Sequence, residues 1–198
     1  METGTATKAS ARERLLAAAN ELFYSAGVQS VGIDRVIERA GVAKASLYNL
    51  FGSKEGLVCA YLDLRHERMR DRITRTLTRF RTPREQLLGV FDALGEAFTD
   101  PEYNGCAFAR ATAETAEDSA IRQVADHYRA WVRHLFTELA AASGYADPEA
   151  LARQLLLLYD GAGQSARMDG DASAATTARA AAAALLDAAP HAERTTTA

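Results

Sequence analysis

The residues best suited to chemistry lie in one short segment, Gly41 to Leu57, and their types suit binding rather than catalysis. The segment reads Gly-Val-Ala-Lys-Ala-Ser-Leu-Tyr-Asn-Leu-Phe-Gly-Ser-Lys-Glu-Gly-Leu, a tight turn followed by a helix with polar and cationic side chains. The four histidines, in contrast, show neither nucleophile nor metal-ligand spacing, and no Gly-rich phosphate loop, CxxC pair or HExxH motif occurs. We therefore expect no catalytic residue, no metal site, no cofactor and no enzymatic activity.

A short amphipathic helix is predicted before the turn, over residues 33–40. Its spacing places four apolar side chains on one face: Ile33, Val36, Ile37 and Ala40. Gly41 can adopt the positive φ that ends this helix, because it lacks a Cβ. A second helix over about 43–50, set across the first, can enter a DNA major groove with its N-terminal residues at base edges. The pattern predicts a helix-turn-helix and sequence-selective DNA binding.

The remaining periodicity predicts an all-α fold of about nine helices. Ser10 and Thr82 begin capping boxes, Ser53 is a good N-cap, and β-branched runs of strand length are absent. Apolar residues at helical spacing extend between these signals. The further helices are expected over about 10–26, 53–81, 83–98, 106–116, 121–142, 147–168 and 174–189.

Composition limits the class of protein further. Cys59 and Cys106 lie far apart in the 198-residue chain, so a disulfide framework is not expected and a reducing compartment fits. No segment approaches the ~20 apolar residues of a membrane span, and no signal peptide is evident. We expect a cytoplasmic protein without membrane contact. Residues 1–60 hold seven basic and six acidic side chains, a net charge of +1, so the remainder of the chain carries −4 of the total of −3.

The motif resembles one protein family specifically. Ala40-Gly41-Val42, Lys44, Leu47-Tyr48, Phe51, Ser53-Lys54-Glu55 and Leu57 are similar to the DNA-binding end of the tetracycline-repressor (TetR) family of bacterial transcriptional regulators. The resemblance extends over about residues 10–60. It implies a homodimer on a palindromic operator in double-stranded DNA, and an unknown small-molecule effector. It also implies a DNA-binding domain at 10–55 and a ligand-binding and dimerisation domain at 56–189. From their own residues, the segments 1–9 and 190–198 are expected to be disordered tails.

The resemblance also implies roles for individual residues at the DNA. Lys44 would contact phosphate, Ala45 a thymine methyl group, and Ser46 a base edge by a hydrogen bond. Tyr48 would donate to phosphate, Asn49 would reach a base edge or phosphate, and Lys54 would join an anion site at a helix N-terminus. Leu47 and Phe51 are interpreted as core.

Other arginines permit two interpretations. Arg35 and Arg39 either approach DNA or, for Arg39, pair with Glu38 or Glu13. The arginine row along the long fourth helix is interpreted as a solvated face rather than a nucleic-acid patch. This row comprises Arg65, Arg68, Arg70, Arg72 and Arg75.

Three positions depart from the family pattern, and each removes a group that binds or caps the backbone. Ala43 stands where Ser often caps the recognition helix, Leu50 stands where His is common, and Gly32 stands where Ser or Thr is frequent. These departures predict weaker phosphate binding.

The effector pocket is expected among the fourth to eighth helices, and the last two long helices are expected to form a four-helix bundle across the dimer axis. The candidate lining residues are aromatic: Phe91, Phe98, Phe108, Tyr128 and Trp131. The favoured function is a repressor released by a small molecule. The alternatives are a co-ligand-dependent activator and a small-molecule carrier with a weakened DNA-binding end.

Overall fold

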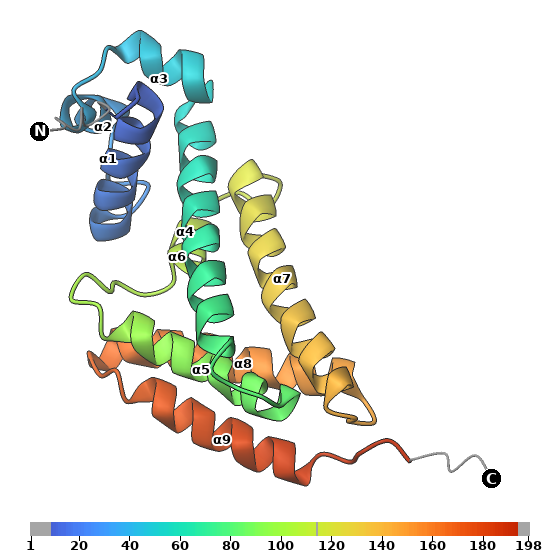
Figure 1. The fold of residues 1–198 in the computed structure, drawn as a ribbon. Coiled ribbons are helices and arrows are strands. Elements are labelled where there is room, and N and C mark those ends of the chain that lie inside the picture. Colours follow the sequence, from blue (N-terminus) through green and yellow to red (C-terminus); the bar gives the residue numbers. More distant parts are fainter. Residues whose placement is uncertain (1–8, 114, 194–198) are drawn as a thin grey trace, which may run out of the picture. The chain divides into compact units, whose positions relative to one another are not determined.

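The computed structural model describes residues 9–113 and 115–193, and these residues form nine helices and no strand (Figure 1). The all-α fold class is thereby confirmed. Most of both expected tails, residues 1–8 and 194–198, lies outside the described residues. The helices are α1 (Ala11–Ala26), α2 (Ile33–Ala40), α3 (Lys44–Phe51), α4 (Lys54–Leu77), α5 (Pro83–Phe98), α6 (Ala107–Thr112), α7 (Ala120–Ala142), α8 (Pro148–Asp169) and α9 (Ala174–Ala188).

The helices divide into two compact units. Unit 1 comprises the chain up to Arg65 together with Ala107–Ala125, and unit 2 comprises His66–Cys106 and the chain from Asp126 onward. Helices α4 and α7 therefore contribute residues to both units. None of the described helices is both long enough and apolar enough to cross a membrane.

Unit 1 contains the helix-turn-helix, in which α1 packs on both α2 and α3. The capping box at the start of α1 is formed: Glu13 N donates to Ser10 Oγ, and Ser10 N donates to Glu13 Oε2 at 2.7 Å. Gly41 has φ 62° and ends α2 in the left-handed conformation, as its lack of a Cβ allows. Its amide donates to the Glu38 carbonyl, which turns the chain toward α3.

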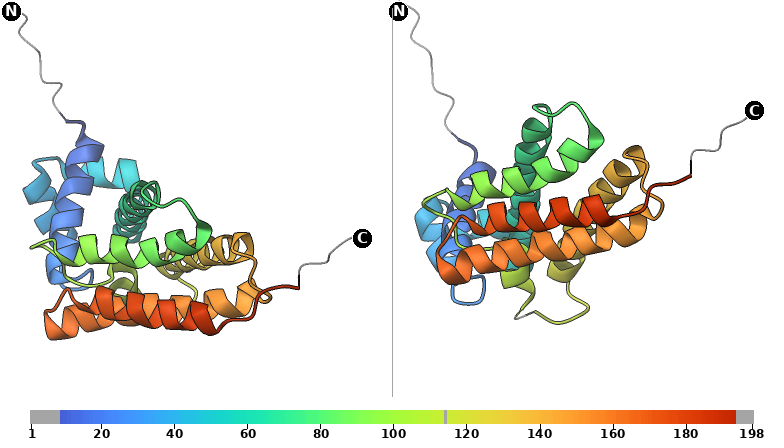
Figure 2. Two further views of the ribbon diagram at one scale, coloured as in Figure 1. Left: turned by 60° about the horizontal axis from the view of Figure 1, so that its bottom comes forward. Right: turned by 90° about the horizontal axis from the view of Figure 1, so that it is seen from below.

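Unit 2 contains three helices that lie side by side, α5, α8 and α9 (Figure 2). Thr82 and Glu85 form the capping box of α5, and Asp147 caps α8 by accepting from Ala150 N at 2.9 Å. The alanine-rich α9 buries Ala175, Ala178, Ala182 and Leu186. Small side chains let helices approach closely, and this explains how so apolar a segment packs as a helix.

Two helices are shorter than the sequence pattern predicts. Helix α4 ends at Leu77 rather than near 81, because amides 79 and 80 bond to carbonyls three residues back and tighten the last turn. Helix α6 covers Ala107–Thr112 rather than 106–116. The Thr112 hydroxyl donates to the Phe108 carbonyl at 2.9 Å, and such side-chain bonds compete with the helical backbone pattern.

Candidate nucleic-acid interface

Helix α3 has one buried residue and a polar outer surface. Leu47 is fully buried, whereas the Lys44, Ala45 and Asn49 side chains are exposed. Tyr48 is 44 % exposed although it is aromatic, and Ser46 is half-buried. The side chains expected to reach DNA thus share the accessible side of one short helix, while Leu47 holds that helix on the unit 1 core.

The ammonium group of Lys44 already has a partner within the protein. Lys44 Nζ lies 2.9 Å from Asp34 Oδ1 at the start of α2, and both side chains are exposed. The hydrogen bond from Lys44 to Asp34 raises the pKa of Lys44 above its usual value, so this lysine stays charged. A DNA phosphate would compete with the Asp34 carboxylate for the same ammonium.

The two arginines of α2 differ in their contacts. Arg35 is exposed, and its side chain is available on the surface of α2. Arg39 lies 2.8 Å from Glu21 of α1, so its expected partners, Glu38 and Glu13, were wrong. The pairing joins α1 to α2 across eighteen positions of sequence, a separation that helical spacing alone does not reveal.

The junction between α3 and α4 depends on a glycine that the sequence pattern did not single out. Ser53 acts as the predicted cap, with its Oγ accepting from Gly56 N at 3.0 Å. A Cβ placed on Gly56 would lie 2.0 Å from the carbonyl oxygen of Phe51. Glycine is therefore needed for this close backbone approach. Lys54, at the N-terminus of α4, is half-buried.

Other helices of unit 1 brace the C-terminal end of α1 at Tyr24. Arg110 of α6 donates through Nη1 to the Tyr24 carbonyl at 2.6 Å, and the Arg65 guanidinium lies 3.7 Å from the centre of the Tyr24 ring. Arg65 is thus half-buried against an aromatic ring, which corrects its interpretation as part of a solvated face. Ala120 N, at the start of α7, donates to Glu55 of α4 at 3.1 Å.

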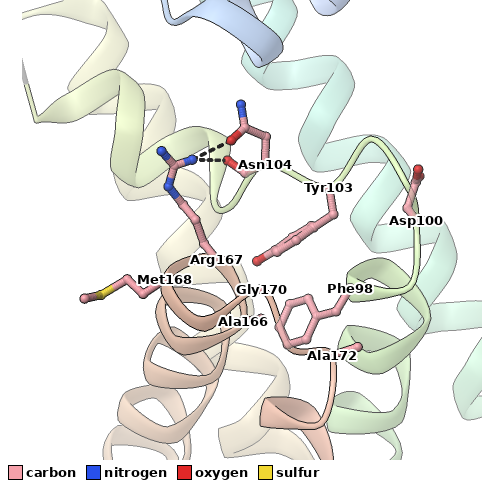
Figure 3. Close-up of a pocket in the computed structure, with 9 residues that line it drawn as sticks. All are labelled: Phe98, Asp100, Tyr103, Asn104, Ala166, Arg167, Met168, Gly170 and Ala172. Atoms are coloured by element: carbon pink, nitrogen blue, oxygen red, sulfur yellow. Dashed lines mark hydrogen bonds between the residues drawn. The ribbon is translucent and has the colours of Figure 1, made fainter.

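The aromatic residues proposed for an effector pocket occupy different surroundings. Phe91 is buried against Phe136, and Phe108 is buried in unit 1. Phe98 lines a pocket of about 540 Å³ in unit 2 (Figure 3). Tyr128 and Trp131 lie together on α7, where both rings contact the His66 ring.

A buried hydroxyl pair lies beside this last group. The hydroxyl groups of Tyr128 and Tyr159 are 2.6 Å apart and form a hydrogen bond between α7 and α8. Burial raises the pKa of both tyrosines well above the usual value, because a phenolate would lose its hydration there. A ligand role for these five aromatic residues stays a prediction.

Comparison with known proteins identifies the family to which this architecture belongs. The family described as "Bacterial regulatory proteins, tetR family" matches residues 15–61, the segment that contains most of α1, all of α2 and α3, and the start of α4. A TetR-family transcriptional regulator from Streptomyces coelicolor is 32 % identical in sequence; the match covers 89 % of this chain and 94 % of that one, with a TM-score of 0.83. The chain belongs to the TetR family.

Further relatives of this TetR-family member agree. A second solved structure, a TetR-type regulator from Streptomyces avermitilis, is 34 % identical over 88 % of this chain and 99 % of that chain, with a TM-score of 0.74. Among curated proteins, the transcriptional activator FasR of Mycolicibacterium smegmatis is 33 % identical over 82 residues, 41 % of this chain and 37 % of the relative. The regulator LmrA of Bacillus subtilis is 30 % identical over 124 residues, 61 % of this chain and 66 % of the relative.

The curated relatives and the solved structures match this chain over different lengths. The FasR match spans little more than a third of that relative's own length. The family assignment, in contrast, rests on structures matched over nearly their whole length. The protein is a DNA-binding transcriptional regulator with a helix-turn-helix, as the sequence motif predicted.

Proposed function

We propose that this regulator is a repressor that binds a palindromic operator as a homodimer and is released by a small molecule. The observation that supports DNA reading most directly is the division of α3 into a buried Leu47 and an exposed polar surface. A helix held in this way can lie in a major groove while its N-terminal residues contact bases.

The residues of α3 that are expected to reach DNA have distinct proposed tasks. Ala45 would contact a thymine methyl group, and Ser46 would bond to a base edge, so these two select sequence. Lys44 and Tyr48 would bind phosphate and set the position of the helix. Asn49 suits either task. Lys54 with the first amides of α4, and Arg35 of α2, would add backbone contacts at the rim.

The homodimer is proposed to form through α8 and α9. Leu157 of α8 is 70 % exposed. Large apolar side chains at such exposure are typical of surfaces that a partner covers. Leu157→Glu should therefore lower the dimer fraction in sedimentation at a fixed protein concentration. Gln123→Glu, at an exposed position of α7 outside the proposed interface, is the control.

Release by an effector is proposed to act through α4. This helix is continuous from Lys54 to Leu77 and has residues in both units. An effector that binds better to one conformation of unit 2 would shift the population toward it. If that conformation misplaces the recognition helices relative to half-sites about 34–36 Å apart, the operator is released.

Two observations favour a second candidate, a regulator that needs a co-ligand to bind or activate. Neither α2 nor α3 has a side-chain cap, since Gly32 and Ala43 occupy the cap positions. A missing cap costs about 1 kcal/mol, so the free recognition helix is less firmly formed. The relative FasR is itself named an activator. A small-molecule carrier with a weakened DNA-binding end is the third candidate.

Selection of bound duplexes from a random DNA pool, at two salt concentrations, tests the proposal. An inverted repeat with salt-sensitive affinity is expected. Lys44→Ala should weaken binding to every sequence, whereas Ser46→Ala should relax the preference at one position. Arg133→Ala, an exposed arginine on α7 outside the proposed interfaces, controls for the loss of one positive charge.

The other outcomes of the selection discriminate between the candidates. A single asymmetric half-site would overturn the homodimeric arrangement. Salt-sensitive binding without an enriched motif would favour the co-ligand or carrier function, and repeating the selection with candidate ligands would then separate those two.

A further inference from the structure

The pocket beside Phe98 lies wholly within unit 2, at the ends of α5 and α8. Its volume is about 540 Å³, within the range of small-molecule sites, and it is partly open to solvent. Three small residues, Ala166, Gly170 and Ala172, form part of its wall and leave this space open. The other lining residues are Phe98, Asp100, Tyr103, Asn104, Arg167 and Met168 (Figure 3).

The loop that follows α5 is held in place by bonds to α8. The Tyr103 hydroxyl donates to the Gly163 carbonyl at 3.0 Å. Arg167 donates through Nη1 to the Asn104 carbonyl oxygen at 2.9 Å and to Asn104 Oδ1 at 2.5 Å. Gly105 has φ 81°, and a Cβ there would lie 2.4 Å from Arg167 Cδ. Loop and helix therefore approach closely, and the pocket is formed before any ligand arrives.

The chemistry of the pocket is divided between its two ends. Figure 3 shows the Arg167 guanidinium on one side and Asp100 on the other, with the rings of Phe98 and Tyr103 between them. The centres of these two rings are 4.9 Å apart and their planes are tilted by 48°. An apolar, aromatic middle thus separates a cationic end from an anionic end.

Arg167 retains hydrogen-bonding capacity beyond its two bonds to Asn104. Within the described residues, both of its hydrogen bonds are made through Nη1, so Nε and Nη2 can donate to an added acceptor. Two parallel donors on a planar guanidinium match the two oxygens of a carboxylate. Asp100 Oδ1 accepts from Glu102 N at 2.9 Å, and its negative charge disfavours a second acidic group at the opposite end.

We propose that this pocket binds a small aromatic monocarboxylate, with its acid on Arg167 and its ring against Phe98 and Tyr103. The inference names an effector class and rests on the proposed function for its regulatory meaning. Binding itself involves no DNA, so it is measured separately. Three related compounds test the separate parts of this proposal. An aromatic amide lacks the negative charge that would bind Arg167, and acetate lacks the aromatic ring. Terephthalate has a second carboxylate, which would lie toward Asp100.

Isothermal titration of the full chain with benzoate tests this inference. Benzoate should bind at least about tenfold more tightly than benzamide, since a charge-assisted bond is worth more than a neutral one. Acetate and terephthalate should bind more weakly than benzoate. Arg167→Gln should lower benzoate affinity by at least about tenfold. Arg153→Gln, on the same helix and outside the pocket, should leave it unchanged.

A second measurement covers the case in which Arg167→Gln loosens the loop. Asp100→Asn removes the opposing charge and should raise terephthalate affinity toward that of benzoate. In protein labelled at the methionine methyl groups, benzoate should shift the Met168 signal and leave Met69 of α4 unmoved. A shift of Met69 alone, or equal binding of benzoate and benzamide, would overturn the assignment.

The inference and the proposed function fail in different ways. Benzoate binding that does not alter operator affinity would leave the pocket assignment standing and would argue against this site as the effector site. Absence of benzoate binding, with operator release by some other compound, would reject the pocket assignment and leave the repressor proposal intact.

Discussion

The helix-turn-helix and the packed helices of unit 2 are stabilised in different ways. Helices α2 and α3 have eight residues each, lack side-chain caps, and bury few residues, chiefly Val36, Ala40 and Leu47. Helices α5 and α8 begin with side-chain caps and bury long apolar faces. A short uncapped helix depends on its few buried anchors, whereas a long capped helix distributes its stability over many contacts. Single substitutions should therefore have larger effects in the first region.

Loss of the α3 anchor should have the largest effect. Leu47→Ala removes a fully buried side chain and should cost about 2–5 kcal/mol of unfolding free energy in urea denaturation. Leu50→Ala changes the same residue type on the same helix, but Leu50 is 43 % exposed, so its cost should stay below about 1 kcal/mol. Equal costs would show that α3 is not anchored as described.

A pair of helical glycines extends the comparison: Gly56 lies at the junction of α3 and α4 in unit 1, and Gly161 lies in α8 of unit 2. Gly56→Ala forces a Cβ against the Phe51 carbonyl and should cost about 1–3 kcal/mol, with loss of operator binding as α3 shifts. Gly161→Ala on α8 meets no atom within 4 Å and should stabilise the protein by up to about 1 kcal/mol. Denaturant unfolding at one protein concentration measures both.

A smaller effect is expected from the buried hydroxyl pair of unit 2. Tyr159→Phe removes its bond to Tyr128 and should cost about 1 kcal/mol of unfolding free energy.

The pKa values of both tyrosines are raised in the folded state, so the unfolded chain releases these protons first as pH rises. Stability should therefore be full below about pH 10 and fall above it. Tyrosinate absorbance of the folded wild type should show two tyrosines that ionise later than the rest. Their ionisation together with the others would contradict the burial.

The smallest effect concerns the charge pair of the DNA-binding end. Asp34→Asn frees Lys44 for phosphate and should raise operator affinity about two- to fivefold, the range of one exposed ion pair. Glu21→Gln makes the same charge change at the Arg39 pair. If both variants raise affinity equally in a binding titration, the gain reflects net charge rather than release of Lys44.

Features governed by local sequence were predictable, and features that join distant segments were not. The capping boxes at Ser10 and Thr82, the left-handed Gly41 and the buried Leu47 are each indicated by the residue types within a few positions, and all four are confirmed. The pairing of Asp34 with Lys44 needs the angle between two helices.

The pocket of unit 2 lay beyond sequence reasoning for the same reason. Tyr103 and Gly163 are 60 positions apart in the sequence, and Asn104 and Arg167 are 63 positions apart. Only the path of the loop after α5 brings them together. Of the five aromatic candidates, Phe98 alone lines this pocket, because aromatic residues at helical spacing mostly fill a core.

The hydrogen bond from Arg110 to the Tyr24 carbonyl has a consequence for local unfolding within unit 1. Helix α6 has six residues, far fewer than the roughly 12–15 at which an isolated helix becomes marginally stable. Its order must therefore come from the contacts it makes within unit 1. Backbone amides of α6 should exchange with solvent deuterium only when the end of α1 also opens, so the two segments form one cooperative unit of local unfolding.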